Sequence, residues 1–172
     1  PRARRWTHWK PRMADQRILV VQLADLGDLV LSTPALAALR AAHPAAHIAL
    51  LTTAHSASLV AEGELVDEVI TFDKHTFDSP KALLKPANLK RALGLARRLR
   101  AGRYDVTIYF HHFSTRFGAL KFAALGWSAG SARRLGLDNG NGFFLTEHVP
   151  DGGFGARHQA QYWLDLVGRL GA

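Results

Sequence analysis

Short apolar runs alternate along the chain with segments of helical spacing. Residues 18–23 form an apolar, β-branched run interrupted only by Gln22, which is typical of a strand buried on both faces of a parallel sheet. From residue 29 to residue 40 the apolar side chains recur at roughly helical spacing. Asp28 stands just ahead of them, where a helix needs an N-terminal cap. The pattern therefore predicts a strand, a polar loop and a helix.

The same alternation continues along the rest of the chain. Further strands are predicted at residues 47–52, 66–72, 104–110, 132–137 and 143–149, and further helices at residues 53–62, 87–100, 115–125 and 158–170. Residues 73–86 are predicted to form a long loop, and residues 151–155 resemble a linker. Strands that alternate with helices predict a three-layer α/β fold with a mostly parallel sheet.

The composition of the 172 residues is that of one globular domain, with 48% hydrophobic and 21% charged residues. The absence of cysteine excludes a disulfide framework, a thiolate metal site and a catalytic thiol. No apolar run approaches the roughly 20 residues that span a bilayer, and the first residues lack the apolar core of a secretion signal. We therefore expect a cytoplasmic location.

The formal net charge of +8 is unevenly distributed. Residues 1–16 form a basic segment with two tryptophans, which we expect to be a disordered tail, with an anionic membrane or nucleic acid as its alternative partner. A second basic region surrounds the amphipathic helix predicted at residues 87–100. It is either a solvated face or a surface that attracts a phosphorylated ligand or an anionic membrane. Nucleic acid is not expected there, because the region lacks interleaved aromatic residues.

Gly27 and Asp28 lie where the first strand meets the first helix, which is the usual ligand crevice of an α/β sheet. A carboxylate in such a crevice can act as a general base, and it can equally be a helix cap. The residues alone leave both interpretations open. Gly27 is the only glycine of the loop, so neither the dinucleotide fingerprint nor the P-loop pattern is present.

A second polar group follows the fourth predicted strand and lies at the same edge of the sheet. His111 and His112 would either line the crevice or lie on the surface. A metal site built from both is not expected, because neighbouring side chains diverge on an extended chain. Ser114 and Arg116 come next, and an arginine at a helix start opposes the helix dipole. A bound anion would explain Arg116, and so would simple solvation.

The segment from residue 18 to residue 40 resembles the opening of glycosyltransferase family 9, the heptosyltransferase family of lipopolysaccharide core synthesis. The resemblance rests on LGDLV at residues 26–30 with Thr33 and Pro34, and on His43 followed by Pro44. Weaker pieces follow in the family's order at residues 48–51, 66–70, 104–106 and 134–136 and at His158. Together they cover most of the chain from residue 17 to residue 172.

The resemblance implies a GT-B fold of two Rossmann-like halves, in which residues 17–172 are the N-terminal, acceptor-side domain. The donor nucleotide sugar would be held mainly by the C-terminal half, and we expect this chain alone not to transfer sugar. Asp28 would be the base of an inverting reaction that needs no metal or other cofactor. The acceptor-binding residues would be Gly27, His111, His112, Ser114, Arg116, Lys81 and Lys85.

The implied reaction moves a sugar from a nucleotide sugar to a glycolipid or polysaccharide acceptor, with peripheral association at the inner face of an anionic membrane. The family's usual residues after the fourth strand are replaced by Tyr109, Phe110, His111 and His112, so the resemblance does not imply a particular acceptor. The alternative, from another class of protein, is a non-catalytic module that binds an anionic or phosphorylated glycan.

Overall fold

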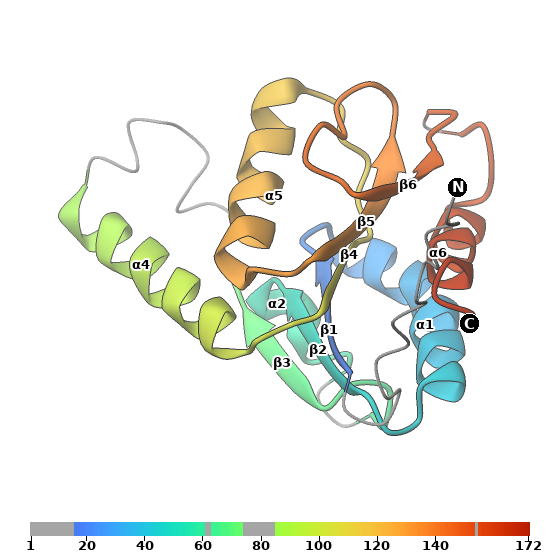
Figure 1. Ribbon diagram of the computed structural model, residues 1–172, viewed down its shortest axis with the longest axis horizontal. Coiled ribbons are helices and arrows are strands. Elements are labelled where there is room, and N and C mark those ends of the chain that lie inside the picture. Colours follow the sequence, from blue (N-terminus) through green and yellow to red (C-terminus); the bar gives the residue numbers. More distant parts are fainter. Residues whose placement is uncertain (1–15, 61–62, 74–84, 154) are drawn as a thin grey trace, which may run out of the picture.

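Figure 1 shows the computed structural model, which describes residues 16–60, 63–73, 85–153 and 155–172. Six strands form one sheet in the order β3-β2-β1-β4-β5-β6, and every neighbouring pair is parallel. The strands are β1 (Arg17–Gln22), β2 (His47–Thr52), β3 (Glu68–Thr71), β4 (Val106–Tyr109), β5 (Arg133–Asp138) and β6 (Glu147–Pro150). This is the doubly wound Rossmann order, and it confirms the predicted fold class.

Helices cover both faces of the sheet and complete the three layers. The long helices are α1 (Leu26–Ala42), α4 (Pro86–Ala101), α5 (Arg116–Ala129) and α6 (Gln159–Gly168), and the short α2 (Ala54–Ala57) follows β2. α1 lies beside α6 on one face and α4 beside α5 on the other (Figure 1). None of the described helices is long and apolar enough to cross a membrane.

β1 lies in the middle of the sheet, and its side chains alternate between two hydrophobic cores. Ile18 and Val20 pack in the core beneath α1 and α6. Leu19 and Val21 pack in the core beneath α4 and α5. All four side chains are completely buried. Burial on both faces explains why this strand is an almost continuous apolar run rather than an alternating one.

The start of α1 differs from the sequence prediction. The helix begins at Leu26, and its N-cap position is Asp25, so the interpretation of Asp28 as the cap is wrong. The backbone N–H groups of Asp28 and Leu29 both donate to the carbonyl oxygen of Asp25, at 3.1 and 3.2 Å. Asp28 is therefore the third residue inside the helix, and the Asp25 side chain makes no capping hydrogen bond.

Two further predictions differ in extent: the strand predicted at residues 143–149 is β6, which begins only at Glu147, and the helix predicted at residues 53–62 is shorter. α2 covers only Ala54–Ala57 of the predicted helix, with Val60 buried behind it and Leu59 44% exposed. Residues 74–84 of the predicted loop and most of the basic tail, residues 1–15, lie outside the described residues. α4 begins at Pro86, a residue favoured in the first turn because its missing N–H group needs no partner there.

Candidate functional site

The candidate site lies where the strand order changes direction, between the carboxyl ends of β1 and β4. The backbone N–H of Phe110 donates to the carbonyl oxygen of Val21 at 3.0 Å, which places the two strand ends side by side. α1 begins just beyond β1, and α5 begins just beyond β4. In sheets of this order the crevice outside these two strand ends is the usual place for a ligand.

Asp28 is half-buried in the first turn of α1, where the helix dipole stabilises a negative side chain. Its backbone carbonyl accepts a hydrogen bond from Ser32 Oγ at 2.7 Å. Gln22, completely buried at the end of β1, donates from Nε2 to Ser32 Oγ at 3.1 Å. Gln22 Oε1 accepts from the backbone N–H of Ala24 at 3.0 Å. The buried side-chain amide of Gln22 therefore links β1 to the loop that follows it and to the first turn of α1, which carries Asp28.

Sequence reasoning missed the role of Gln22 and Ser32. A signal was present, because Gln22 is the one polar residue in an apolar run and Ser32 follows Asp28 by one helical turn. A buried polar side chain needs hydrogen-bond partners, so Gln22 had to bond to a nearby loop or helix. Which backbone groups it would meet depends on the path of the loop.

The loop between β1 and α1 opens onto a concave surface. Gly27, which is the second residue of α1 and not a loop residue, is exposed, and a β-carbon added to it would meet no atom within 4 Å. Asp25 lines a cavity of about 350 Å³ together with side chains at the ends of β2 and β3: Thr53, Ala54, His55, Ser56, Phe72 and Asp73. Hydroxyl, imidazole and carboxylate groups on a concave surface are suited to hydrogen bonding a polar ligand. The sequence analysis had not proposed this group.

The loop after β4 brings three predicted residues to the same edge as Asp28. His111 is half-buried, with its ring stacked on Phe122 at 4.2 Å between ring centroids. Ser114 is exposed. Arg116 is also exposed, as the first residue of α5. Thr115 caps that helix by accepting a hydrogen bond from the backbone N–H of Gly118 at 3.0 Å, as expected for a threonine at this position.

His112 points into the interior, so it neither lines an open crevice nor lies on the surface. Its Nδ1 is 2.9 Å from Asp151 Oδ2, and its Nε2 is 3.1 Å from Gln159 Oε1. The Asp151 side chain is only 1% exposed and also accepts a hydrogen bond from the backbone N–H of Gly153. The segment predicted to be a linker, residues 151–155, thus begins with a buried carboxylate that fixes the loop after β4 to the end of β6, and Gln159 connects the same histidine to α6. An acceptor-binding role for His112 stays a prediction.

Of the two predicted lysines only Lys85 is among the described residues, and it is not part of this edge. Lys81 lies outside the described residues. Lys85 is exposed and immediately precedes α4, whose N-terminal end projects away from the sheet in Figure 1. Within the described ranges no group of three or more histidine, aspartate or glutamate side chains is placed to hold a metal ion. The predicted residues that the fold gathers are thus Gly27, Asp28, His111, Ser114 and Arg116.

Neither a protein-family model nor a curated protein matches the sequence. Solved structures match the fold clearly. A family 9 glycosyltransferase from Veillonella parvula superposes with a TM-score of 0.70 at 25% sequence identity, covering 91% of this chain and 41% of its own. The Escherichia coli heptosyltransferase WaaC with ADP-2-deoxy-2-fluoro heptose gives 0.75 at 19% identity, with coverages of 91% and 49%. The Escherichia coli ADP-heptose lipopolysaccharide heptosyltransferase II gives 0.62 at 20% identity, with coverages of 88% and 40%.

This chain therefore spans less than half the length of each of these proteins. Those coverages are consistent with an N-terminal domain, and the sheet order is the one expected for a Rossmann-like half of a GT-B enzyme. The resemblance to glycosyltransferase family 9 that the sequence suggested is thus confirmed by the fold, which is the Rossmann-like arrangement of the heptosyltransferase structures.

Proposed function

We propose that this chain is the acceptor-side half of an inverting glycosyltransferase that moves a sugar from a nucleotide sugar to a glycolipid or polysaccharide acceptor. The likeness to the WaaC structure with ADP-2-deoxy-2-fluoro heptose supports a nucleotide-sugar donor. We assign the binding of that donor to a second, C-terminal half and propose no further cofactor. The acceptor would meet the enzyme at the cytoplasmic face of a membrane.

The observation that carries the proposal is the placement of Asp28. Its carboxylate lies in the first turn of α1, at the junction of β1 and β4, on a backbone fixed by Gln22 and Ser32. A general base must be held within hydrogen-bond reach of the proton it accepts, about 2.6–3.2 Å. We assign this role to the Asp28 carboxylate, because the backbone that carries it is held at the carboxyl ends of β1 and β4.

In the proposed reaction, Asp28 accepts the proton of an acceptor hydroxyl while that oxygen attacks the anomeric carbon of the donor sugar. The new carbon–oxygen bond forms as the bond from the anomeric carbon to the nucleotide diphosphate breaks, and the diphosphate leaves with the bonding electrons. Attack opposite the leaving group inverts the configuration at that carbon. Deprotonation of the attacking hydroxyl by a positioned base contributes typically about 10²–10⁴-fold to the rate.

The other residues at this edge would bind the acceptor. Ser114 is exposed and can hydrogen-bond a sugar hydroxyl, and the exposed backbone at Gly27 leaves room for a ligand to approach. Arg116 is suited to a phosphate or carboxylate group, because a guanidinium binds such anions with paired hydrogen bonds. His111, held against Phe122, would form one wall of the acceptor site. Lys81 and Lys85 would contact anionic groups of a larger acceptor.

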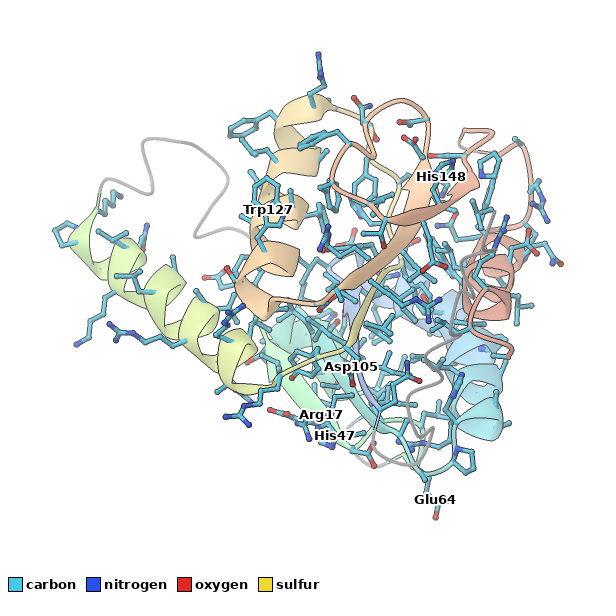
Figure 2. All side chains as sticks on the ribbon, viewed as in Figure 1. Arg17, His47, Glu64, Asp105, Trp127 and His148 are labelled. Atoms are coloured by element: carbon cyan, nitrogen blue, oxygen red, sulfur yellow. The ribbon has the colours of Figure 1, made fainter. Side chains whose placement is uncertain are left out.

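The test is transfer from nucleotide sugars by the chain joined to a donor-binding half. Asp28→Asn and Asp28→Ala should each lower kcat by about 100-fold or more if the carboxylate is the base. Glu64→Gln is the matched control, because Glu64 is an exposed carboxylate just before β3, at the opposite end of the molecule (Figure 2). Full activity in Asp28→Ala would refute the assigned role. Binding of a phosphorylated glycan without any transfer would favour the alternative of a non-catalytic module.

A further inference from the structure

A second concave surface lies at the amino ends of the strands, whereas the candidate site lies at their carboxyl ends. It is a cleft of about 710 Å³ between the C-terminal ends of α4 and α5 and the start of β4. Its lining consists of Arg97, Arg100, Ala101, Arg103, Tyr104, Ala129 and Gly130. Three arginines and no carboxylate therefore surround one cleft. The cleft belongs to the basic region that was predicted from the sequence to be either a solvated face or a surface for a phosphorylated ligand or an anionic membrane.

The arginines of this cleft lack partners within the part of the chain that the structure describes. Arg97, Arg100 and Arg103 form no ion pair and no side-chain hydrogen bond there, and all three are exposed. Arg98, on the same helix, differs: its guanidinium pairs with Glu68 at 2.8 Å. Three like charges around one cleft repel one another, and a bound anion would relieve that repulsion.

The backbone makes room for these side chains. Gly130 ends α5 in a left-handed conformation (φ 72°), and a β-carbon there would collide with the guanidinium of Arg100. A β-carbon at Gly102 would collide with the ring of Tyr104. Arg103 has a positive φ of 48°, which residues other than glycine, asparagine and aspartate seldom adopt. The cleft is thus shaped by the backbone as well as by its side chains.

Exposed apolar side chains on the same two helices indicate the class of ligand. Phe117, Leu120 and Trp127 are spaced along α5 and are 49%, 48% and 53% exposed. Figure 2 shows Trp127 on α5, and Gly130 of the cleft follows it by one turn. α4 exposes Leu89 and Leu93 by about half as well. A soluble phosphorylated molecule needs only the arginines, whereas a lipid surface uses cations, tryptophan and apolar side chains together.

We propose that the cleft of Arg97, Arg100 and Arg103 binds the phosphate groups of anionic phospholipids, and that Trp127 with the apolar residues of α5 enters the membrane interface. The guanidinium groups pair with the lipid phosphates, and the indole lies at the level of the headgroups. The surface lies at the end of the strands away from Asp28, so lipid binding requires no sugar transfer. Absence of lipid binding would not contradict the proposed transferase function, and absence of transfer would not contradict lipid binding.

The test uses the full chain and vesicles of phosphatidylglycerol mixed with phosphatidylcholine, compared with vesicles of phosphatidylcholine alone, in a flotation assay. Binding should need the anionic lipid and should fall with added salt. Replacing Arg97, Arg100 and Arg103 by glutamine should lower the partition coefficient at least about tenfold, since each cation near an anionic surface contributes to binding. Replacing the same three residues by lysine should retain most of the binding.

Two further variants separate this cleft from general charge. A control with Lys90, Arg91 and Arg169 changed to glutamine loses the same charge outside the cleft and should bind nearly as well as the parent chain. A variant with Arg2, Arg4 and Arg5 changed to glutamine examines the basic tail. Equal weakening by either variant would overturn the assignment to the cleft. Every variant must keep the circular dichroism spectrum of the parent chain. If the glutamine variant does not fold, the lysine variant still tests whether positive charge in the cleft is enough for binding.

Tryptophan fluorescence examines the insertion step. In a chain with Trp6 and Trp9 changed to phenylalanine, the emission should shift to shorter wavelength on anionic vesicles. Adding Trp127→Phe to that chain should remove most of the shift, because the remaining Trp163 is already buried. A shift that survives in Trp127→Phe would refute the role of α5. Calorimetry with inorganic phosphate and with a single-stranded oligonucleotide examines the other ligands, and tight binding of either one without vesicle binding would overturn the proposal.

Discussion

The hydroxyl of Tyr109 fills the space beside Gly126 that a β-carbon at that position would occupy. Tyr109 ends β4 and is completely buried, with the rings of Phe113, Phe122 and Phe144 set edge-on around it. Burial raises the pKa of this phenol far above its ordinary value of 10.0. Its hydroxyl has no hydrogen-bond partner among the described residues, so packing alone holds it against α5.

Gly126→Ala should therefore lower the free energy of unfolding by about 1–3 kcal/mol, because the added methyl group overpacks the interface between α5 and β4. Chemical denaturation measures the change. Gly94→Ala on α4 is the matched control: a β-carbon there meets open space, and the change should stabilise the helix by up to about 1 kcal/mol. In a Tyr109→Phe background the loss at position 126 should shrink. An equal loss in both backgrounds would show that the hydroxyl is not the obstacle.

The buried pair of His112 and Asp151 should be far more important for stability than an exposed pair. Asp151→Ala removes a carboxylate that is 1% exposed and leaves Nδ1 of the buried imidazole without its hydrogen-bond partner, which should lower the free energy of unfolding by about 1–3 kcal/mol. Asp165→Ala on α6 breaks the half-exposed ion pair with Arg157, which precedes that helix, and should lower the free energy of unfolding by less than about 1 kcal/mol. Similar values for the two variants would contradict the interpretation of Asp151 as a structural anchor.

The ion pair between Arg98 and Glu68 should make stability depend on pH in the acidic range. The hydrogen bond from Arg98 holds the pKa of Glu68 below its ordinary value of 4.5. Because the carboxyl loses its proton more readily in the folded chain, the pair stabilises the fold above the unfolded pKa. That stabilisation disappears as the pH falls through the folded pKa.

Arg98→Gln should accordingly lower the free energy of unfolding by at most about 1 kcal/mol at pH 7, since both side chains are partly exposed. The difference from the parent chain should shrink as the pH falls through the folded pKa of Glu68, below which the carboxyl is protonated in both states. Thermal unfolding followed from pH 7 to pH 3 measures it, with Arg91→Gln on the same helix as the control. A difference that does not shrink between pH 7 and pH 3 would exclude the ion pair as its source.

Gln22→Ala should loosen the loop that leads to Asp28. The substitution leaves the backbone N–H of Ala24 without its partner and removes the donor to the Ser32 hydroxyl, which should lower the free energy of unfolding by about 1–3 kcal/mol. Amide hydrogen exchange at Ala24 should become faster. Thr33→Ala removes a hydroxyl that bonds only to the carbonyl of Val30 on the exposed side of α1, and should leave that exchange rate unchanged. If amide hydrogen exchange at Ala24 is as slow in Gln22→Ala as in the parent chain, Gln22 does not anchor this loop.

The strands of this fold could be predicted from the sequence where nearly all of their side chains are buried. β2 spans the predicted residues 47–52 without a shift, because five of its six side chains are buried. The start of α1 could not be read in the same way. Its first turn contains Leu26 and Gly27, which are both exposed, so the apolar spacing becomes visible only at Leu29. The spacing of apolar residues indicates where the side chains of a helix become buried. In α1 this is about one turn after the helix itself begins.

The pairing of His112 with Asp151 lay beyond such reasoning for a different reason. The two residues are 39 positions apart, and the segment around Asp151 is rich in glycine, which locally indicates a flexible connection. Spacing likewise showed that residues 87–100 are amphipathic but did not show what covers the apolar face. Leu99 is buried against the sheet, whereas Leu89 and Leu93 are about half exposed.

The central position of β1 has a consequence for how the chain is synthesised. Its neighbour β4 follows much later in the sequence, and the backbone N–H of Arg17 bonds to Asp105, 88 residues further on. At synthesis rates of about 5–20 residues per second, one edge of this apolar strand waits on the order of 10 seconds for its partner. An unpaired hydrophobic edge invites wrong pairing during that time. The nascent chain, rather than the finished fold, is therefore where we expect a need for chaperone protection.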